Sequence, residues 1–319
     1  MRLNRVVIGI DFSERSIAAA QWVARYFAQK SELVLVHALQ LPETPRFLRD
    51  RLAVREEDVE TCRVGARARL HQFGQQIGRG LVWEEVRAGR PDEQVLLVAQ
   101  DYDADLIVIG SHRDRPGLWN RLGSTAERIL SASPMPVLVV HGAPRSLPRS
   151  VLAAVDDSDA SRTVIEHACV VARRLRAHGK VAHVLPQHSL QRLLSVGEVA
   201  ASDFRLIEAE QQVVEVTHNW LVRQVGSQDD LTPVVLLGDA AETILTEARR
   251  MGSELIVLGK EGRSRVKRFL LGSVAGTVIR GANCPILVIP SNKPREAAER
   301  QNAPEVNSHG EPVSVGAVS

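Results

Sequence analysis

The chain has 319 residues, of which 44% are hydrophobic and only 4% aromatic, and its formal net charge at pH 7 is +2. This length favours two domains, and so small a net charge argues against nucleic-acid binding by bulk electrostatics. The three cysteines, Cys62, Cys169 and Cys284, are odd in number and far apart, which argues against a disulfide framework or a zinc pair and favours buried thiols. No apolar run approaches the roughly 18 residues of a membrane span, so we expect a cytoplasmic protein with no membrane partner.

Short apolar runs alternate with helical periodicity along the first half. The predicted strands lie near residues 4–10, 32–38, 81–87, 105–109 and 136–140. The predicted helices cover 14–29, a segment within 50–78, 91–102 and 122–133. Because aromatic residues are scarce, the core must consist of Val, Leu, Ile and Ala, which favours a parallel sheet covered by helices.

The same pattern begins again at Ser150. The predicted strands of the second half lie near residues 150–155, 180–185, 232–237, 254–258 and 285–289. In each half the first strand ends in an acid, Asp11 or Asp156, and the second strand ends at a histidine, His37 or His183. The chain is therefore predicted to be a duplication of one unit of about domain size.

We expect an α/β fold of two tandem units, each an open five-stranded parallel sheet between helices. Residues 1–143 and 149–291 are the predicted domains, and the polar residues 292–319 are predicted to form a disordered tail. The last strand of each domain is an apolar edge that needs cover. We therefore expect the two domains to pair as an intramolecular pseudo-dimer, or each to pair with a second chain as a homodimer.

A glycine-rich, basic segment follows the fourth strand of the second half, "GKEGRSRVKRFLLGS". Gly259 and Gly262 let the main chain approach a ribose or a phosphate, and Gly272 and Ser273 begin the next helix, where free N–H groups favour an anion. The spacing is neither a Walker A loop, because no lysine directly precedes Ser273, nor a dinucleotide fingerprint. No motif for covalent catalysis stands out, so no catalytic residue is predicted.

Both halves resemble domains of the universal stress protein family, up to about Pro290. The motif of the ATP-binding subtype, G-x-x-G, nine residues, then G-S/T, is matched by Gly259, Gly262, Gly272 and Ser273. Asp156 and the last strand "PILVIP" add to the resemblance. It implies a five-stranded parallel sheet with ATP at the point where the strand order reverses, and pairing of domains along the last strand.

The resemblance also implies a role for each matched position. Asp156 would face the base and the ribose, the main chain at Val184 would contact adenine, and Gly259 would lie against the ribose. The phosphates would lie against Gly262, Gly272, Ser273 and Val274. A carboxylate that accepts from a ribose or an amine, and N–H groups that donate to phosphate, suit these roles chemically.

The first half departs from the motif at one position. Its counterparts of the site residues are Asp11, Ala38, Gly110, Gly123 and Ser124, but Arg113 stands where the second glycine is expected. That side chain would either fill the phosphate space or bind phosphate through its guanidinium group. We therefore expect weakened or altered nucleotide binding in this half.

Several of these residues could have a structural role instead of a role in ligand binding. Asp11 and Asp156 could be helix N-caps or first-turn acids, and His37 and His183 are expected to be packed or bonded to the backbone rather than catalytic. Our interpretation is a nucleotide-dependent stress-response regulator that binds ATP, ADP or AMP, with or without Mg²⁺, and an unidentified regulatory protein. Two alternatives stay open: a slow ATP-hydrolysing or autophosphorylating enzyme, and a nucleotide-free dimerisation or interaction module.

Overall fold

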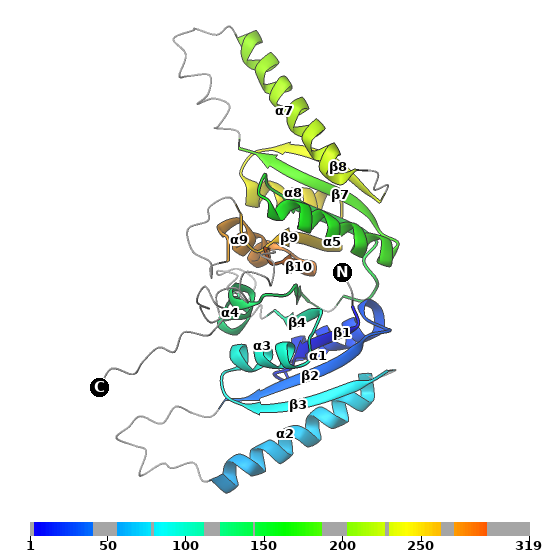
Figure 1. The fold of residues 1–319 in the computed structure, drawn as a ribbon, viewed down its shortest axis with the longest axis vertical. Helices are drawn as coiled ribbons and strands as arrows, with labels where there is room; N and C mark the ends of the chain where they lie inside the picture. Colours follow the sequence, from blue (N-terminus) through cyan, green and yellow to red (C-terminus); the bar gives the residue numbers. More distant parts are fainter. Residues whose placement is uncertain are drawn as a thin grey trace, which may run out of the picture.

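A computed structural model describes residues 3–40, 56–77, 80–111, 122–142, 144–186, 203–226, 230–262 and 271–291. The predicted tail, 292–319, and the predicted site residue Arg113 lie outside the described residues. The described strands form one ten-stranded sheet with the order β3-β2-β1-β4-β5-β10-β9-β6-β7-β8. The molecule is elongated along this sheet, with helices α2 and α7 at its two ends (Figure 1).

The first half supplies five strands: β1 (Arg5–Gly9), β2 (Glu32–Leu39), β3 (Val82–Ala88), β4 (Leu106–Gly110) and β5 (Val137–Val140). Its helices are α1 (Glu14–Trp22), the π-helix η1 (Val23–Phe27), α2 (Glu56–Ile77), α3 (Pro91–Asp101) and α4 (Ser124–Ala132). All five strands run parallel to their neighbours within this half. Pro91 occupies the first turn of α3, where its missing N–H leaves no hydrogen bond unmade.

The second half repeats the arrangement. Its strands are β6 (Ser150–Val155), β7 (His178–Leu185), β8 (Leu231–Leu237), β9 (Leu255–Gly259) and β10 (Ile286–Ile289). Its helices are α5 (Ala160–Leu175), α7 (Asp203–Val225), α8 (Ala240–Arg250) and α9 (Ser273–Gly281). The predicted strands are confirmed in both halves, and the largest difference is at β7, which begins at His178 rather than near 180.

One predicted helix differs from the structure. The segment expected as a single helix over 14–29 is α-helical only to Trp22 and continues as a π-helix to Phe27. The wider turn brings the rings of Trp22 and Phe27, five residues apart, to 5.6 Å in a stacked contact, and both side chains are buried. Trp22 also donates its indole N–H to the main-chain oxygen of Ser146, at 2.8 Å, which holds the connection between the halves against the first half.

The two halves meet at their last strands. β5 and β10 are antiparallel, with Val139 opposite Ile286 and Leu138 opposite Leu287. The apolar edge of each half is thus covered by the other half, as the pseudo-dimer alternative predicted. A single sheet therefore passes through the whole chain.

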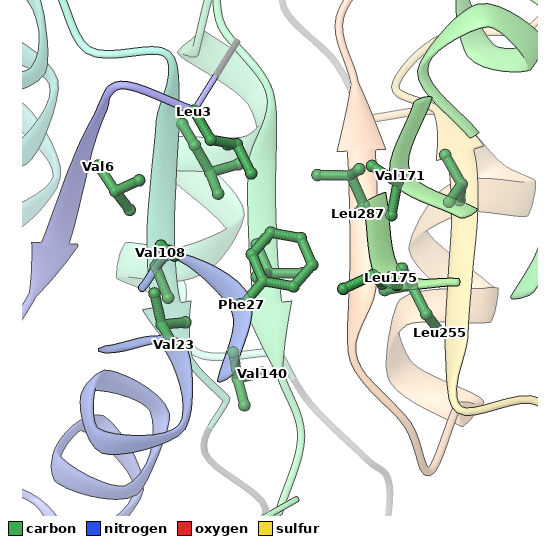
Figure 2. Close-up of a cluster of buried hydrophobic side chains, with 14 of the residues drawn as sticks. Leu3, Val6, Val23, Phe27, Val108, Val140, Val171, Leu175, Leu255 and Leu287 are labelled. Atoms are coloured by element: carbon green, nitrogen blue, oxygen red, sulfur yellow. The ribbon is translucent and has the colours of Figure 1, made fainter. Parts of the chain in front are cut away.

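Side chains of most strands alternate between two buried layers, one on each face of the sheet, whereas the edge strand β3 contributes to only one of them. One layer contains residues of α1, η1, α2, α5 and α7, and the other contains residues of α3, α4, α8 and α9. Both layers include residues of both halves. In Figure 2, Phe27 and Val140 of the first half lie on one side of the junction, and Val171 and Leu287 of the second half lie on the other.

The prediction that all three cysteines are buried is wrong. Cys169 on α5 is buried, but Cys62 on α2 is exposed and Cys284 is half-buried. The prediction of buried thiols is wrong for Cys62 because it lies among exposed residues of α2. None of the described helices is long and apolar enough to cross a membrane.

Candidate functional site

Two cavities lie at the carboxyl ends of the strands, one in each half. The strand order reverses between β1 and β4 in the first half and between β6 and β9 in the second, and each cavity is lined by residues that follow those strands. The volumes are about 320 Å³ in the second half and about 340 Å³ in the first. A crevice at the point of reversal is where open parallel sheets bind ligands.

The second-half cavity brings together all seven residues that the sequence singles out in this half. Its lining includes Asp156, Val184, Gly259, Gly262, Gly272, Ser273 and Val274. These residues come from the loop after β6, the end of β7, the end of β9 and the loop that follows it, and the start of α9. The cavity also has apolar lining residues from both layers of the core: Val164 of α5 from one layer, and Ile244 of α8 and Leu258 of β9 from the other.

Each loop glycine of this cavity stands where a side chain has little room. A Cβ atom on Gly262 would lie 3.1 Å from the Asp156 carboxylate, and one on Gly272 would lie 3.3 Å from the main-chain oxygen of Lys260. A Cβ atom on Gly259 would lie 3.2 Å from the main-chain oxygen of Glu261. A side chain at any of these positions would therefore require its neighbour to shift, and glycine avoids that crowding.

Two of the helices that begin at the cavities, α9 and α4, have a glycine at the N-cap position. The N-cap residues of α9 and α4 are Gly272 and Gly123, and no side chain among the described residues caps either helix. In contrast, Asp239 caps α8 by accepting the Glu242 N–H at 3.0 Å. The first N–H groups of α9 and α4 therefore present partial positive charge that suits an anion.

Asp156 organises the loop between β6 and α5. Its Oδ1 atom accepts the main-chain N–H of Ser158 at 3.0 Å and the hydroxyl groups of Ser158 and Ser161 at 2.5 and 2.9 Å. The N-cap of α5 is Asp159, so the expectation that Asp156 could itself be the N-cap is wrong. Its Oδ2 atom lies on the side of Gly262.

Asp11 has the same local role in the first half. Its Oδ1 atom accepts the main-chain N–H and the hydroxyl group of Ser13, at 2.9 and 2.6 Å. Ser13 in turn is the N-cap of α1, with its side chain accepting the N–H of Ser16. In both halves the acid that follows the first strand accepts hydrogen bonds within the loop, and a later residue occupies the N-cap position, but of these two N-cap residues only Ser13 makes a side-chain cap bond with a described residue.

The model of the universal stress protein family matches residues 2–141 and 148–290. The chain belongs to this family. A universal stress protein of Mycolicibacterium smegmatis is 25% identical over 301 residues, covering 89% of this chain and 96% of that protein. One of Mycobacterium tuberculosis is 27% identical over 302 residues, covering 89% and 95%. The crystal structure of a universal stress protein from Archaeoglobus fulgidus has the same fold, with a TM-score of 0.64 at 19% identity, covering 92% of this chain and 98% of that one.

The first half of this universal stress protein has a cavity that matches the one in the second half. Asp11, Ala38, Gly110, Gly123 and Ser124 line the first-half cavity together with Thr125 and Pro91. Gly110 is a crowded position, because a Cβ atom there would lie 3.0 Å from the main chain of Arg15 and Ser16. The remaining predicted residue, Arg113, lies outside the described residues.

The two histidines at the strand ends bond to the backbone, as predicted. His183 Nδ1 lies 3.0 Å from the main-chain oxygen of Val155, and His37 Nδ1 lies 2.8 Å from that of Ile10. Because a carbonyl oxygen only accepts, Nδ1 of each ring carries the proton. Each ring thus ties the end of the second strand of its half to the end of the first, beside the cavity.

The donor set of the second-half cavity fits a nucleotide better than a metal ion. It offers main-chain amides, the Ser273 hydroxyl and the Asp156 carboxylate. No cluster of three or more His, Cys, Asp or Glu side chains in the described part of the chain could hold a metal ion.

Two residues of this loop, Lys260 and Glu261, were not predicted as site residues. Lys260 is buried, with 8% of its surface exposed, and its burial lowers the pKa of the ammonium group, while Glu261 opposes that shift. Glu261 accepts the hydroxyl of Ser291 at 2.8 Å. Lys260 follows a strand in a segment rich in basic residues, so no sequence pattern distinguishes it from a solvated lysine.

Proposed function

We propose that this universal stress protein binds ATP or a related adenine nucleotide, mainly in the second-half cavity, and acts as a nucleotide-dependent stress-response regulator. The observation that carries the proposal is the gathering of Asp156, the glycine loop and the uncapped start of α9 around one cavity of about 320 Å³. That volume lies within the range of about 300–1,000 Å³ typical of small-molecule sites. We assign the nucleotide-binding units to residues 1–143 and 149–291.

The cavity offers a separate surface to each part of the nucleotide. The base would lie against Val184, Ile244 and Leu258, which belong to one apolar layer. The ribose hydroxyls would donate to the Asp156 carboxylate, which its serine partners hold in place. The phosphates would accept hydrogen bonds from the N–H groups at Gly262 and at the start of α9, where the helix dipole favours negative charge.

A magnesium ion, if one accompanies the nucleotide, would be held chiefly by the phosphates and by water. Mg²⁺ keeps several water ligands and commonly binds through substrate phosphates. In this proposal Mg²⁺ is therefore a companion of ATP. Affinity for AMP should accordingly depend less on Mg²⁺ than affinity for ATP.

The first-half cavity is proposed to bind nucleotide more weakly or in an altered manner. Ala38 and Asp11 line this cavity at the positions that correspond to Val184 and Asp156 of the second half. Helix α4, which begins at this cavity, has no side-chain cap among the described residues. The difference in sequence is Arg113 at the position that corresponds to Gly262. A side chain at that position adds volume and charge where the second half has neither.

Calorimetric titration of the full chain with ATP, ADP, AMP and adenosine tests the proposal. We expect saturable binding of at least one adenine nucleotide, with one site of higher affinity. Heating the purified protein and analysing the released small molecules is an independent check for nucleotide that co-purifies. The absence of binding to all four ligands would contradict the proposal and favour the nucleotide-free interaction module, whereas Mg²⁺-dependent phosphate release that falls in Ser273→Ala would favour the enzyme.

A further inference from the structure

Lys260 joins the two parts of the glycine motif through its main chain. Its N–H donates to the main-chain oxygen of Ile289 at 2.7 Å, and its carbonyl accepts the N–H of Gly272 at 2.9 Å. Gly272 is the N-cap of α9, and Lys260 directly follows Gly259. The position of Lys260 therefore sets the distance between the Gly259–Gly262 turn and the start of α9.

The side chain of Lys260 crosses from the second half into the first. Its Nζ atom donates to the main-chain oxygen of Ser131 at 3.1 Å and to that of Ser133 at 3.3 Å. Ser131 lies in the last turn of α4, and Ser133 is its C-cap residue. The C-terminal end of a helix carries partial negative charge, so a buried ammonium group is well placed there.

The matching position of the first half is built differently. Ser111 donates its N–H to the main-chain oxygen of Val140 at 3.1 Å, as Lys260 does to Ile289. Its short side chain bonds to His141 Nδ1 at 2.6 Å, and its carbonyl accepts from Arg15 at 3.3 Å. These partners all belong to the first half, whereas the Lys260 side chain reaches the other half.

We propose that Lys260 is a positioning residue that holds the phosphate-binding main chain of the second half in place by anchoring it on helix α4 of the first half. The site in the second half is then complete only when the two halves are paired. The inference rests on the proposed function for the identity of its ligand, but its geometric part concerns the ligand-free protein. It assigns to the first half a role in the second-half site, in addition to any ligand of its own.

Amide hydrogen exchange of the ligand-free full chain tests the geometric part. In Lys260→Met, which keeps an unbranched apolar side chain but removes the ammonium group, we expect faster exchange of the Gly272 N–H, which donates to the Lys260 carbonyl at 2.9 Å, because the anchor of that carbonyl is lost. Exchange in strand β3, at the opposite end of the sheet, should be unchanged. An unchanged exchange rate at Gly272 would overturn the proposal whether or not the protein binds ATP.

The affinities for ATP and adenosine separate positioning from a general loss of structure. Because the main chain that would bind the phosphates loses its anchor, we expect the affinity of Lys260→Met for ATP to fall about tenfold. Adenosine has no phosphate, so its affinity should change less than about twofold. An equal loss for both ligands, or no loss for ATP, would contradict the proposal.

Two further variants control for charge and for folding. Arg249→Met removes one positive charge from an exposed position near the C-terminal end of α8 and should leave both affinities unchanged. Lys260→Arg retains a cation and should recover part of the ATP affinity and of the protection at Gly272. If Lys260→Met does not fold, Lys260→Ser, which copies Ser111 of the first half, is tested by the same comparisons.

Discussion

The Oδ2 atom of Asp156 lies 3.1 Å from the position that a Cβ atom on Gly262 would occupy. Movement of the carboxylate away from Gly262 is restricted, because the hydroxyl groups of Ser158 and Ser161 donate hydrogen bonds to its Oδ1 atom. A side chain at position 262 must therefore displace the carboxylate or enter the cavity. This contact links the part of the site proposed for the ribose to the part proposed for the phosphates.

Gly262→Arg places in the second half the residue that the first half has at its matching position. We expect the affinity for ATP, measured by calorimetry, to fall at least about tenfold, because the side chain enters the phosphate space and presses on Asp156. Gly65→Arg on α2 is the matched control, since a Cβ atom at Gly65 has no neighbour within 4 Å. Equal affinity of Gly262→Arg and Gly65→Arg for ATP would refute the assignment of this loop.

Asp156→Asn replaces Oδ2, the carboxylate oxygen on the side of Gly262, with an amide NH₂ group. It keeps Oδ1, which accepts the hydrogen bonds of Ser158 and Ser161. The new amide would present N–H donors where the ribose hydroxyls and the adenine amine also donate. We expect the affinities for ATP and adenosine to fall together, each by about tenfold, with little change in thermal stability. The same substitution at Asp11 should leave the higher-affinity site unchanged, and a loss at that site would show that it lies in the first half.

The ion pairs of Glu247, on α8, are expected to stabilise the fold less at acidic pH. Its buried carboxylate accepts from Arg250 at 2.7 Å and from Lys180 of β7 at 3.0 Å, and these bonds lower its pKa from 4.5 to about 2. Because the folded-state pKa is depressed, the stabilisation is fully present above pH 4.5 and is lost as the pH falls through about 2. Glu247→Gln should lower the free energy of unfolding by about 1–2 kcal/mol at neutral pH.

Denaturant unfolding of wild type and Glu247→Gln over a series of pH values measures this contribution. The difference between the two proteins should shrink as the pH falls below 4.5. A difference that stays constant down to the lowest pH at which both proteins fold would mean that the ion pairs do not supply the stability.

Leu287→Ala tests the junction between the halves. Leu287 is fully buried and lies opposite Leu138 across the β5–β10 pair. Loss of this side chain should lower the free energy of unfolding by about 3 kcal/mol, because the sheet leaves little room for collapse around the cavity. Leu237→Ala, at a side chain of the edge strand β8 that is 40% exposed, should cost less than about 1 kcal/mol. Equal costs in urea denaturation would contradict a tightly packed junction.

The duplication, the order of strands and helices, and the residues around the second-half cavity could all be predicted from the chain itself. Alternation of β-branched runs with helical periodicity is a local signal, and parallel strands joined by helices place their carboxyl ends along one edge. Asp156 and Gly259 therefore had to lie near each other at the point where the strand order reverses. The π-helix after Trp22 could not be predicted, because its apolar pattern differs little from that of an α-helix.

The two α/β units and the position of the candidate site in each thus follow from local patterns in the sequence. The pairing of the last strands within the chain, and the hydrogen bond from Lys260 to Ser131 across 129 positions of sequence, are visible only in the folded protein. Local periodicity reports which face of an element is buried, but not which distant element covers it. That choice depends on how the apolar edges and the helix ends of the two halves fit together in space.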